Sequence, residues 1–387
     1  MNKKINDFIQ SGISEFNKKN FIKAEKIFIE ILREYPEGVM IYTYLIPILI
    51  YQNKYNEAAN YSQKLFNLNK KSEIGLVYLG IINFKLSNFE KSLNNLNDAL
   101  KINSKSVDAL INIGATLHKL ERNSEALASV QKAIGFNNKN SIAYHTLGSI
   151  YESEAKFNDA IESFKKAILI NPNDYESIHG LSLIQLSKKN YSAGWANYEA
   201  RWLRGNMKFR YPDIKKLVSL KGIENKKILI WHEQGFGDTI QFSRYVSLLI
   251  KLKAIVVFEV QQQLLSFLKD QIDCDVIEKA ESKDFDFQSP LLSVPKLFSI
   301  DGNDIPSSRP YFKCNRERYL YWKSLLFLSK EKINIGIAIS GNPNHYREEK
   351  RRIHLESFLP LMKLCKIFII QKELNQNDLI FSEQNEE

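Results

Sequence analysis

Apolar residues in the first half of the chain follow a helical spacing that repeats along the sequence. The segment SIAYHTLGSIYESEAKFNDAIESFKKAILINPND, residues 141–174, contains two runs with apolar residues at helical spacing and a polar turn between them. The same pattern recurs every thirty-four residues, and six units fit, beginning near residues 5, 39, 73, 107, 141 and 175. A helical hairpin of this size cannot bury its apolar face alone. We therefore predict a stacked α-helical solenoid over residues 5–205.

Small residues recur in phase with these units. Glycine occupies one register and alanine another in most units, at positions Gly12, Gly80, Gly114, Gly148, Ala24, Ala58, Ala126 and Ala160. Small side chains are needed where the two helices of a unit approach most closely. The pattern resembles the tetratricopeptide repeat. Pro47 falls inside the first helix of the second unit, where a kink is expected.

The tetratricopeptide resemblance implies a concave groove, lined by the first helix of each unit, that binds an extended peptide or a protein segment. The candidate groove residues are apolar in the early units and mixed later: Ile9, Ile13, Phe16, Val77, Ile81, Phe84, His145 and His179. Alternatively, the apolar stripe packs against the next helix or a terminal cap. His145 and His179 share a register one unit apart. Without a third ligand they are expected to face solvent or a partner rather than zinc.

The sixth unit ends differently from the others. The segment KKNYSAGWANYEARWLRG, residues 188–205, keeps helical spacing but gains Trp195, Tyr198, Arg201 and Trp202. These side chains predict a capping helix that covers the open end of the solenoid and docks onto the next domain of the chain. The stretch after it breaks the helical pattern, so we expect a linker over residues 206–226.

From Lys226 onward the periodicity changes type. KILIW is a short β-branched run, GFGD is a tight turn, TIQFSRYVSLLIKL has helical spacing, and AIVVFEV is a second strand. Strand, helix and strand in this order predict a parallel, Rossmann-like α/β unit, with the GFGD loop at the carboxyl edge of its sheet. We assign the region from residue 227 onward to this α/β class.

Two hypotheses compete for the GFGD loop. The first is dinucleotide binding, because GFG begins the GxGxxG pattern and Glu259 ends the second strand where a ribose-binding acid would lie. The third glycine is absent, since Ile240 takes its place. The second hypothesis makes Asp238 a chemical group, although an aspartate at a helix start is also a common cap.

A further resemblance bears on this choice. WHEQGFGDTIQFSRY resembles the opening motif of bacterial proteins that fuse tetratricopeptide repeats to a heptosyltransferase-like glycosyltransferase. Further segments come after it in the expected order: FDFQSPLLSVPKLF, IPSSRPYF, INIGIAISGNPNHYREEKRRIHLESF and IFIIQKE. The resemblance implies a GT-B type arrangement, in which a first Rossmann-like domain, residues 227–330, receives an acceptor and a second, residues 331–387, holds the nucleotide of an activated sugar. It also implies that Asp238 is the general base for an acceptor hydroxyl.

The resemblance suggests further site residues on both sides of the cleft. The loop after the first strand contributes the candidate acceptor residues His232, Glu233, Gln234, Gly235 and Gly237, and the two glycines are expected to allow a sharp turn. The loop after the strand IGIAIS contributes candidate groups for the donor diphosphate, Gly341, Asn342, Arg351 and Arg352. The alternative is that this loop only connects two elements and its arginines are solvated. A nucleotide-sugar would be a co-substrate, and no cofactor or metal is expected.

Only about two strands of the second domain are found before the sequence ends, so we expect this domain to be truncated, with an exposed strand edge and apolar faces. Either another chain supplies the missing portion, or the region is degenerate and inactive.

Composition sets limits on the remaining possibilities. The 387 residues, 44% hydrophobic and 25% charged, are typical of a soluble globular protein. The amino-terminal residues lack the apolar core of a signal peptide, and no apolar stretch is long enough for a membrane span, so we expect a cytoplasmic protein. The net charge of +10 is spread along the chain, which argues against a nucleic-acid surface. The scattered cysteines, Cys274, Cys314 and Cys365, are expected to be reduced structural thiols.

These patterns lead to two functional hypotheses. The first is a glycosyltransferase that moves a sugar from a nucleotide-sugar to a protein or glycan acceptor presented by the repeats. The second is a non-catalytic interaction scaffold, in which the repeats bind a partner and the α/β region is vestigial.

Overall fold

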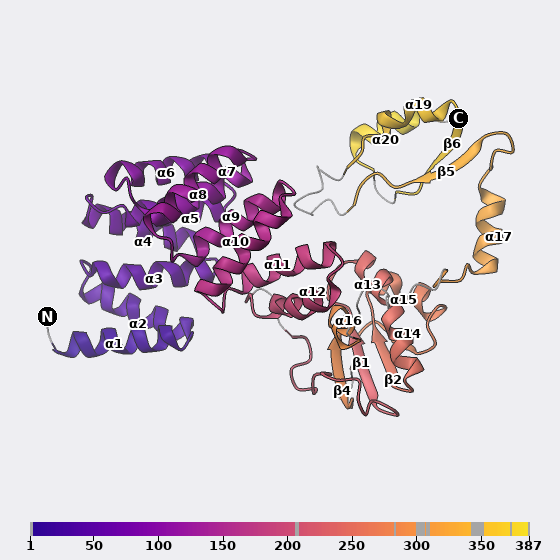
Figure 1. Ribbon diagram of the computed structural model, residues 1–387, viewed down its shortest axis with the longest axis horizontal. Helices are drawn as coiled ribbons and strands as arrows, with labels where there is room; N and C mark the ends of the chain where they lie inside the picture. The colour runs from indigo at the N-terminus through magenta and orange to yellow at the C-terminus, as the bar shows by residue number, and fades with distance from the viewer. Residues whose placement is uncertain are drawn as a thin grey trace. The chain divides into compact units, whose positions relative to one another are not determined.

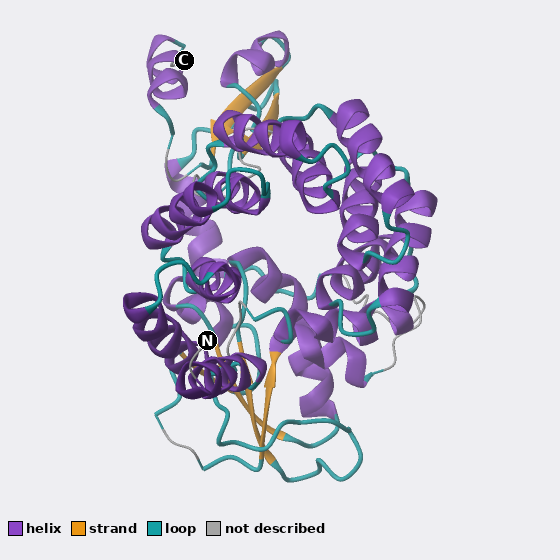
Figure 2. Cartoon of the chain, turned by 90° about the vertical axis from the view of Figure 1, so that its left-hand side faces the viewer, coloured by secondary structure: helices purple, strands orange, loops and turns teal. Residues whose placement is uncertain are grey.

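The computed structural model describes residues 3–205, 209–281, 284–298, 306, 310–341, 352–371 and 374–385. Residues 1–307 form one compact unit and residues 308–387 form a second. Helices and turns alternate through the first part of the first unit, and strands come after them (Figures 1 and 2).

The predicted α-helical solenoid is confirmed. Within described residues 3–205, twelve α-helices form six hairpins: α1 (Lys3–Asn17), α2 (Phe21–Glu34), α3 (Val39–Tyr51), α4 (Tyr55–Leu68), α5 (Ile74–Lys85), α6 (Phe89–Ile102), α7 (Val107–Lys119), α8 (Asn123–Phe136), α9 (Ser141–Ser153), α10 (Phe157–Ile170), α11 (Tyr175–Ser187) and α12 (Tyr191–Tyr198). A short 3-10 helix, η1 (Glu199–Trp202), extends the last of them. Helix α3 runs through Pro47.

The backbone of the hairpin turns repeats with the same period as the sequence. One residue in each turn takes a left-handed conformation, at Lys19, Asn53, Ser87, Glu121, Ala155 and Lys189. Their φ angles lie between 58° and 64°. Six different turns therefore share one geometry, although none of them uses glycine at this position.

The small residues lie where the helices touch, as predicted. A Cβ added at Gly114 would come within 2.3 Å of Val130 Cγ2, and one added at Gly80 would come within 2.5 Å of Leu96 Cγ. Ala126 is fully buried. Because these contacts leave no room for a larger side chain, the small-residue registers set how closely the two helices of a hairpin pack.

A small parallel sheet comes after the solenoid. Its strands are β1 (Lys227–Trp231), β2 (Ile255–Glu259), β3 (Asp275–Ile277) and β4 (Phe287–Pro290), in the order β3-β2-β1-β4. Lys227 lies opposite Ile255 in the pairing of β1 with β2. The predicted strand–helix–strand order is present, but the helical segment between β1 and β2 is divided into α13 (Phe236–Phe242) and α14 (Arg244–Lys251). Helix α15 (Gln262–Lys269) follows β2, while η2 (Leu291–Ser293) and α16 (Val294–Leu297) follow β4.

The segment predicted as a linker packs against this sheet in its described part. The Leu217 amide donates to the Gln288 carbonyl at 2.8 Å, and the Gln288 amide donates to the Lys215 carbonyl at 2.8 Å. These bonds add a short parallel bridge to the edge of β4. Ile214 and Leu217 are buried. The segment is therefore attached to the sheet, and the domain boundaries proposed from the sequence stay a prediction.

The second unit is small. It contains α17 (Arg316–Leu325), β5 (Ile333–Ile337), η4 (Leu355–Phe358), α19 (Leu359–Met362), β6 (Cys365–Ile369) and α20 (Gln376–Gln384). Strands β5 and β6 pair in parallel, and their core includes Ile337, Ile339 and Leu355. None of the side chains of α17 is buried. A Rossmann-like GT-B fold over the α/β regions stays a prediction.

Candidate functional site

The first helices of the early repeats present apolar side chains that are partly open to solvent. Ile13, Phe16, Ile81 and Phe84 are half-buried. The Phe16 ring lies 5.4 Å from the ring of Tyr44 in an edge-to-face arrangement. These four positions can contact a partner while their inner atoms stay packed in the solenoid.

Two other groove candidates are buried in the core of the solenoid. Ile9 is only 2% exposed and Val77 only 6% exposed, and both lie in the cores of the solenoid. A partner could not reach them without opening the repeats. The sequence pattern did not separate core from groove because both lie on apolar faces of the same helices.

The two candidate histidines hold neighbouring elements together. His145 Nδ1 lies 3.0 Å from Ser177 Oγ on α11, and burial lowers the pKa of His145. His179 Nδ1 accepts a hydrogen bond from Arg204 Nη1 at 3.1 Å. Burial, together with Arg204, lowers the pKa of His179 to about 4. Both imidazoles are therefore neutral near pH 7. For His179 the hydrogen bond requires this, because Nδ1 must keep its lone pair to accept from Arg204.

A polar cavity of about 310 Å³ lies beside these histidines. Its walls include His145, Asp174, Glu176 and Arg204. Arg204 Nε forms an ion pair with Glu176 Oε2 at 2.7 Å, and Asp174 accepts from the backbone N–H and the hydroxyl of Ser177. The charged groups in this cavity already have protein partners. Within the described residues, no group of three histidine, cysteine or acidic side chains is placed to bind a metal.

The aromatic residues of the last repeat dock onto the sheet region, as the capping prediction implies. The Trp195 ring lies 5.4 Å from the ring of Phe242 on α13. Gln234 Nε2 donates to the Tyr198 hydroxyl at 2.6 Å. The candidate acceptor residue Gln234 is therefore in contact with the repeats through its side chain.

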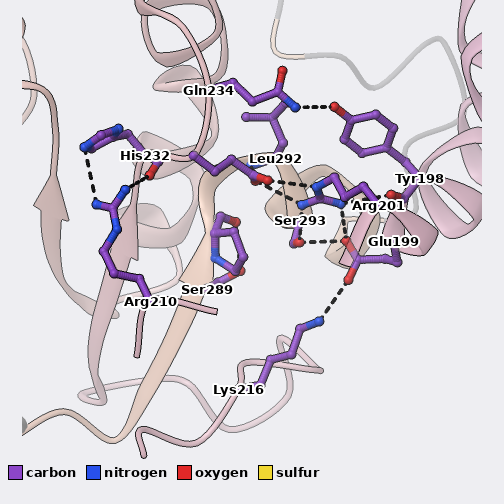
Figure 3. A network of polar contacts seen from close by, with 12 residues as sticks. Tyr198, Glu199, Arg201, Arg210, Lys216, His232, Gln234, Ser289, Leu292 and Ser293 are labelled. Carbon is purple, nitrogen blue, oxygen red and sulfur yellow. Dashed lines mark hydrogen bonds and ion pairs between the residues drawn. The ribbon is translucent and has the colours of Figure 1, made fainter. Parts of the chain in front are cut away.

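Arg201 forms the centre of this junction (Figure 3). Its Nε donates to Glu233 Oε2 at 2.8 Å, and its Nη2 donates to Glu233 Oε1 at 3.0 Å. The side chains of Arg201 and Glu233 are 2% and 0% exposed. Arg201 also bonds Glu199 and the Ser293 hydroxyl, both at 2.8 Å, and the Leu292 amide donates to Glu233 Oε1 at 2.9 Å. A bidentate arginine–carboxylate pair with further hydrogen bonds is the arrangement that a buried pair requires.

The location of this pair bears on ligand binding. In the order β3-β2-β1-β4, the connections from β1 to β2 and from β2 to β3 run toward one edge of the sheet, and the connection from β3 to β4 returns to the other side of β1, so the switch point lies at the carboxyl ends of β1 and β4. Open parallel sheets bind ligands at such a point. Glu233 follows β1 and Leu292 follows β4, and Arg201 binds between these two segments. Glu233 and Ser293, which follow these two strands, thus bind a side chain of the repeats.

A second buried acid lies at the end of β2. Glu259 is 1% exposed, and it binds Arg210 and the Tyr211 hydroxyl, while the Ala280 amide donates to it at 2.9 Å. Arg210 also donates to the His232 carbonyl at 3.0 Å, and burial together with Arg210 lowers the pKa of His232. A ribose would have to displace these partners of Glu259, so the described contacts do not favour dinucleotide binding.

The loop after β1 is an ordinary helix start. Asp238 is half-buried, and its Oδ2 accepts from the Gly235 amide at 3.2 Å, which caps α13. Neither Gly235 nor Gly237 has a positive φ, and a Cβ at Gly237 would meet no atom within 4 Å. The expectation that the turn depends on glycine at these positions is therefore not met. The role of Asp238 as a base stays a prediction.

The candidate donor residues are only partly described. Asn342 and Arg351 lie outside the described residues, and Gly341 is the last residue of the described range 310–341. Arg352 forms an ion pair with Asp378 of α20. Asp378 also accepts from the Leu355 amide at 3.1 Å. The described contacts of Arg352 are thus internal to the second unit.

The pairing of Arg201 with Glu233 and of Arg210 with Glu259 was not predicted from the sequence. The available signals were weak: an arginine within an aromatic cap, and acids at or just after the ends of two apolar strands. Partners this far apart in the chain leave no periodic pattern in the sequence.

Comparison with known proteins agrees with the repeat assignment. A family model described as tetratricopeptide repeat matches residues 107–140 and 142–174. No curated protein matches the chain. None of the helices that the structure describes is long and apolar enough to cross a membrane.

Several solved structures are similar to the helical part. A chain of the APC/C hetero-tetramer Cut9–Hcn1 has 15% identity and a TM-score of 0.47, over 52% of this chain and 41% of that chain. A thermophilic tetratricopeptide repeat protein of Thermus thermophilus has 18% identity and a TM-score of 0.44, over 47% and 99%. YrrB, described as a tetratricopeptide repeat protein with an unusual peptide-binding site, has 17% identity and a TM-score of 0.31, over 46% and 93%. The helical part of this chain thus contains tetratricopeptide repeats, and such repeats imply a protein-interaction scaffold.

Proposed function

We propose that this protein is an interaction scaffold whose repeats bind an extended segment of a partner protein along the first helices. The observation that carries the proposal is the set of half-buried apolar side chains on α1 and α5, Ile13, Phe16, Ile81 and Phe84. They keep a packed base and an accessible outer surface, which suits the apolar anchors of a peptide. The sheet region, held by Arg201, is proposed to cap and stiffen the last repeat.

The proposal can be tested with peptides selected by display on the purified full chain. We expect the double variant Ile81→Ser/Phe84→Ser to weaken a selected peptide by about tenfold or more, or about 1.4 kcal/mol. The matched control is Ile102→Ser/Phe136→Ser, which changes partly exposed apolar residues on the second helices α6 and α8. Circular dichroism checks that both variants keep their helices. If no selected peptide loses affinity in the groove variant, the proposed groove is wrong.

Sugar transfer is the second candidate. It is favoured by the parallel strand–turn–helix at β1, with Asp238 at the start of α13, and by the sequence resemblance around it. The occupied carboxylates at the carboxyl edge count against it, because an acceptor would have to bind beside or displace Arg201 and Arg210. If the protein is a transferase, Asp238→Ala should abolish transfer while peptide binding by the repeats is unchanged. Transfer retained by Asp238→Ala would exclude Asp238 as the base.

A further inference from the structure

A cavity of about 630 Å³ lies between the second helices of the first two repeats. It is lined from α2 and α4, with Tyr42 contributed by α3. None of its lining residues belongs to the candidate groove set. This outer pocket is therefore a separate surface from the groove of the first helices.

The base of the outer pocket is apolar and aromatic. Ile29 and Leu32 line it together with Tyr42 and Tyr61, whose ring centroids are 6.0 Å apart with a tilt of 55°. Tyr42 is buried, and its hydroxyl donates to the Pro36 carbonyl at 2.8 Å. Tyr61 is only half-buried, so its ring is available to a ligand. The open Tyr61 ring, backed by the buried Tyr42 ring and next to aliphatic side chains, suits one bulky apolar side chain.

The rim of the pocket is positively charged. Arg33 and Lys64 are exposed, and no lining residue is acidic. Lys64 Nζ lies 5.3 Å from the centre of the Tyr61 ring. Among the described residues, neither cation forms an ion pair with an acid, and the buried Glu25 of α2 pairs with Lys54 instead. These cations can therefore bind carboxylates without breaking an ion pair within the described residues.

The same place two repeats further along shows what is specific to this pocket. Sixty-eight residues after Arg33 and Lys64, the chain has Lys101 and Lys132, which keeps both positive charges. The positions equivalent to the two tyrosines are Leu110 and Ser129, so the aromatic walls are absent there. Lys101 also forms an ion pair with Asp98 at 2.7 Å. The pair of cations thus recurs at repeats three and four, while its combination with two aromatic rings is found at repeats one and two.

We infer that the outer pocket binds an acidic peptide segment of a partner protein, with one bulky apolar side chain of the peptide packed against the Tyr61 ring and Ile29, and with the carboxylates of the peptide on Arg33 and Lys64. The chemistry favours a peptide over a nucleic acid because two cations do not form the concentrated basic face that a phosphate backbone requires. Burial and the nearby Glu57 raise the pKa of Tyr61, so its hydroxyl stays protonated near pH 7 and can donate to a ligand.

The test uses the full chain and fluorescently labelled short peptides with glutamates on both sides of a central residue. We expect the peptide with central phenylalanine to bind at least about tenfold more tightly than the same peptide with central alanine. Arg33→Glu/Lys64→Glu should weaken the phenylalanine peptide by about tenfold or more. Tyr61→Ser, which places the residue of the equivalent position in repeat four, should remove the preference for phenylalanine over alanine.

The control is Lys101→Glu/Lys132→Glu, which makes the same change of charge at the equivalent place without tyrosines. It should bind the phenylalanine peptide as the unchanged protein does. Equal weakening by both charge variants would show non-specific attraction and overturn the inference, as would equal binding of the phenylalanine and alanine peptides or no binding of either. The groove variant Ile81→Ser/Phe84→Ser should bind normally, so failure here and failure of the proposed groove are distinguishable.

Discussion

At the scale of single residues, the junction between the repeats and the sheet is held by charged side chains that are buried. Arg201 is 2% exposed and Glu233 0%, and the pair joins η1 of the repeats to the segment after β1. Removing one partner from such a pair leaves the other charge without compensation in a site that excludes water. The stability of the junction between solenoid and sheet should therefore depend strongly on this pair.

We predict that Arg201→Met lowers the free energy of unfolding by about 3–5 kcal/mol, measured by urea denaturation, because Glu233 stays buried without its partner. Adding Glu233→Gln should recover part of the loss. Arg122→Met is the control: it breaks a solvent-exposed pair with Glu125 and should lower the free energy of unfolding far less. A loss for Arg201→Met as small as for Arg122→Met would contradict the junction described here.

His179 predicts a dependence of stability on pH. Its pKa is about 4 in the folded protein, below the value of about 6.5 expected when unfolded, so the unfolded chain binds more protons between these values. The free energy of unfolding should therefore fall as the pH is lowered from about 6.5 toward 4. His179→Gln keeps an acceptor for Arg204 and removes this titration.

The measurement is denaturation at a series of pH values. The slope between pH about 6.5 and about 4 should be shallower for His179→Gln than for the unchanged protein, whereas both should be flat between about 7 and 8 as far as this residue is concerned. Identical slopes in the acidic window would show that His179 is not held neutral by the fold.

At the scale of helices and strands, packing overrides local preference. Alanine favours a helix over glycine by about 1 kcal/mol, yet Gly114 of α7 has no room for a Cβ beside Val130 Cγ2. Gly135 of α8 has no atom within 4 Å of that position. Substituting alanine at each of these glycines therefore separates the effect of helix propensity from the effect of steric contact.

We predict opposite effects for the two substitutions. Gly114→Ala should lower the free energy of unfolding by up to about 2 kcal/mol, because the overpacking cost of about 1–3 kcal/mol outweighs the gain of about 1 kcal/mol in helix propensity. Gly135→Ala should raise it by up to about 1 kcal/mol. Thermal unfolding of both variants checks this, and stabilisation by Gly114→Ala would mean that the hairpin is less tightly packed than described.

Sequence patterns predicted elements well where the contacts are local and repeated. The thirty-four-residue period located six helical hairpins, and the change from helical to strand spacing at KILIW located β1. The segment at residues 215–217 was predicted to be part of a linker, but it pairs with β4. This pairing uses the backbone groups of Gln288, about seventy residues later in the chain. Almost any residue type can form such backbone hydrogen bonds, so the pattern of residue types did not predict this pairing.

At the scale of the whole molecule, the same limit applies to the candidate site. Sequence reasoning selected the loop after β1 correctly as the carboxyl edge of a parallel sheet, but it treated Glu233 as free to shape a pocket. The fold instead brings Arg201 to Glu233 from thirty-two positions earlier in the chain. Partners that are distant in the sequence therefore decide which acids a ligand can reach. These partners are known only when the packing of the solenoid against the sheet is known.

This arrangement predicts how the unchanged protein responds to nucleotides. Because the donor candidate Arg352 already pairs with Asp378, and Arg201 and Arg210 bind the acids at the carboxyl edge of the first sheet, we expect nucleoside diphosphates and nucleotide-sugars to give no saturable signal in calorimetry and no thermal protection. Saturable binding of one nucleotide would favour the transferase hypothesis and would justify a search for its acceptor.

The most direct test of the central claim is hydrogen exchange of the full chain with and without a display-selected peptide. Our account predicts slower exchange in the first helices, chiefly α1 (Lys3–Asn17), α3 (Val39–Tyr51) and α5 (Ile74–Lys85), and no change in residues 232–238. Protection confined to residues 232–238, with the first helices unchanged, would contradict it and place the binding surface at the edge of the sheet.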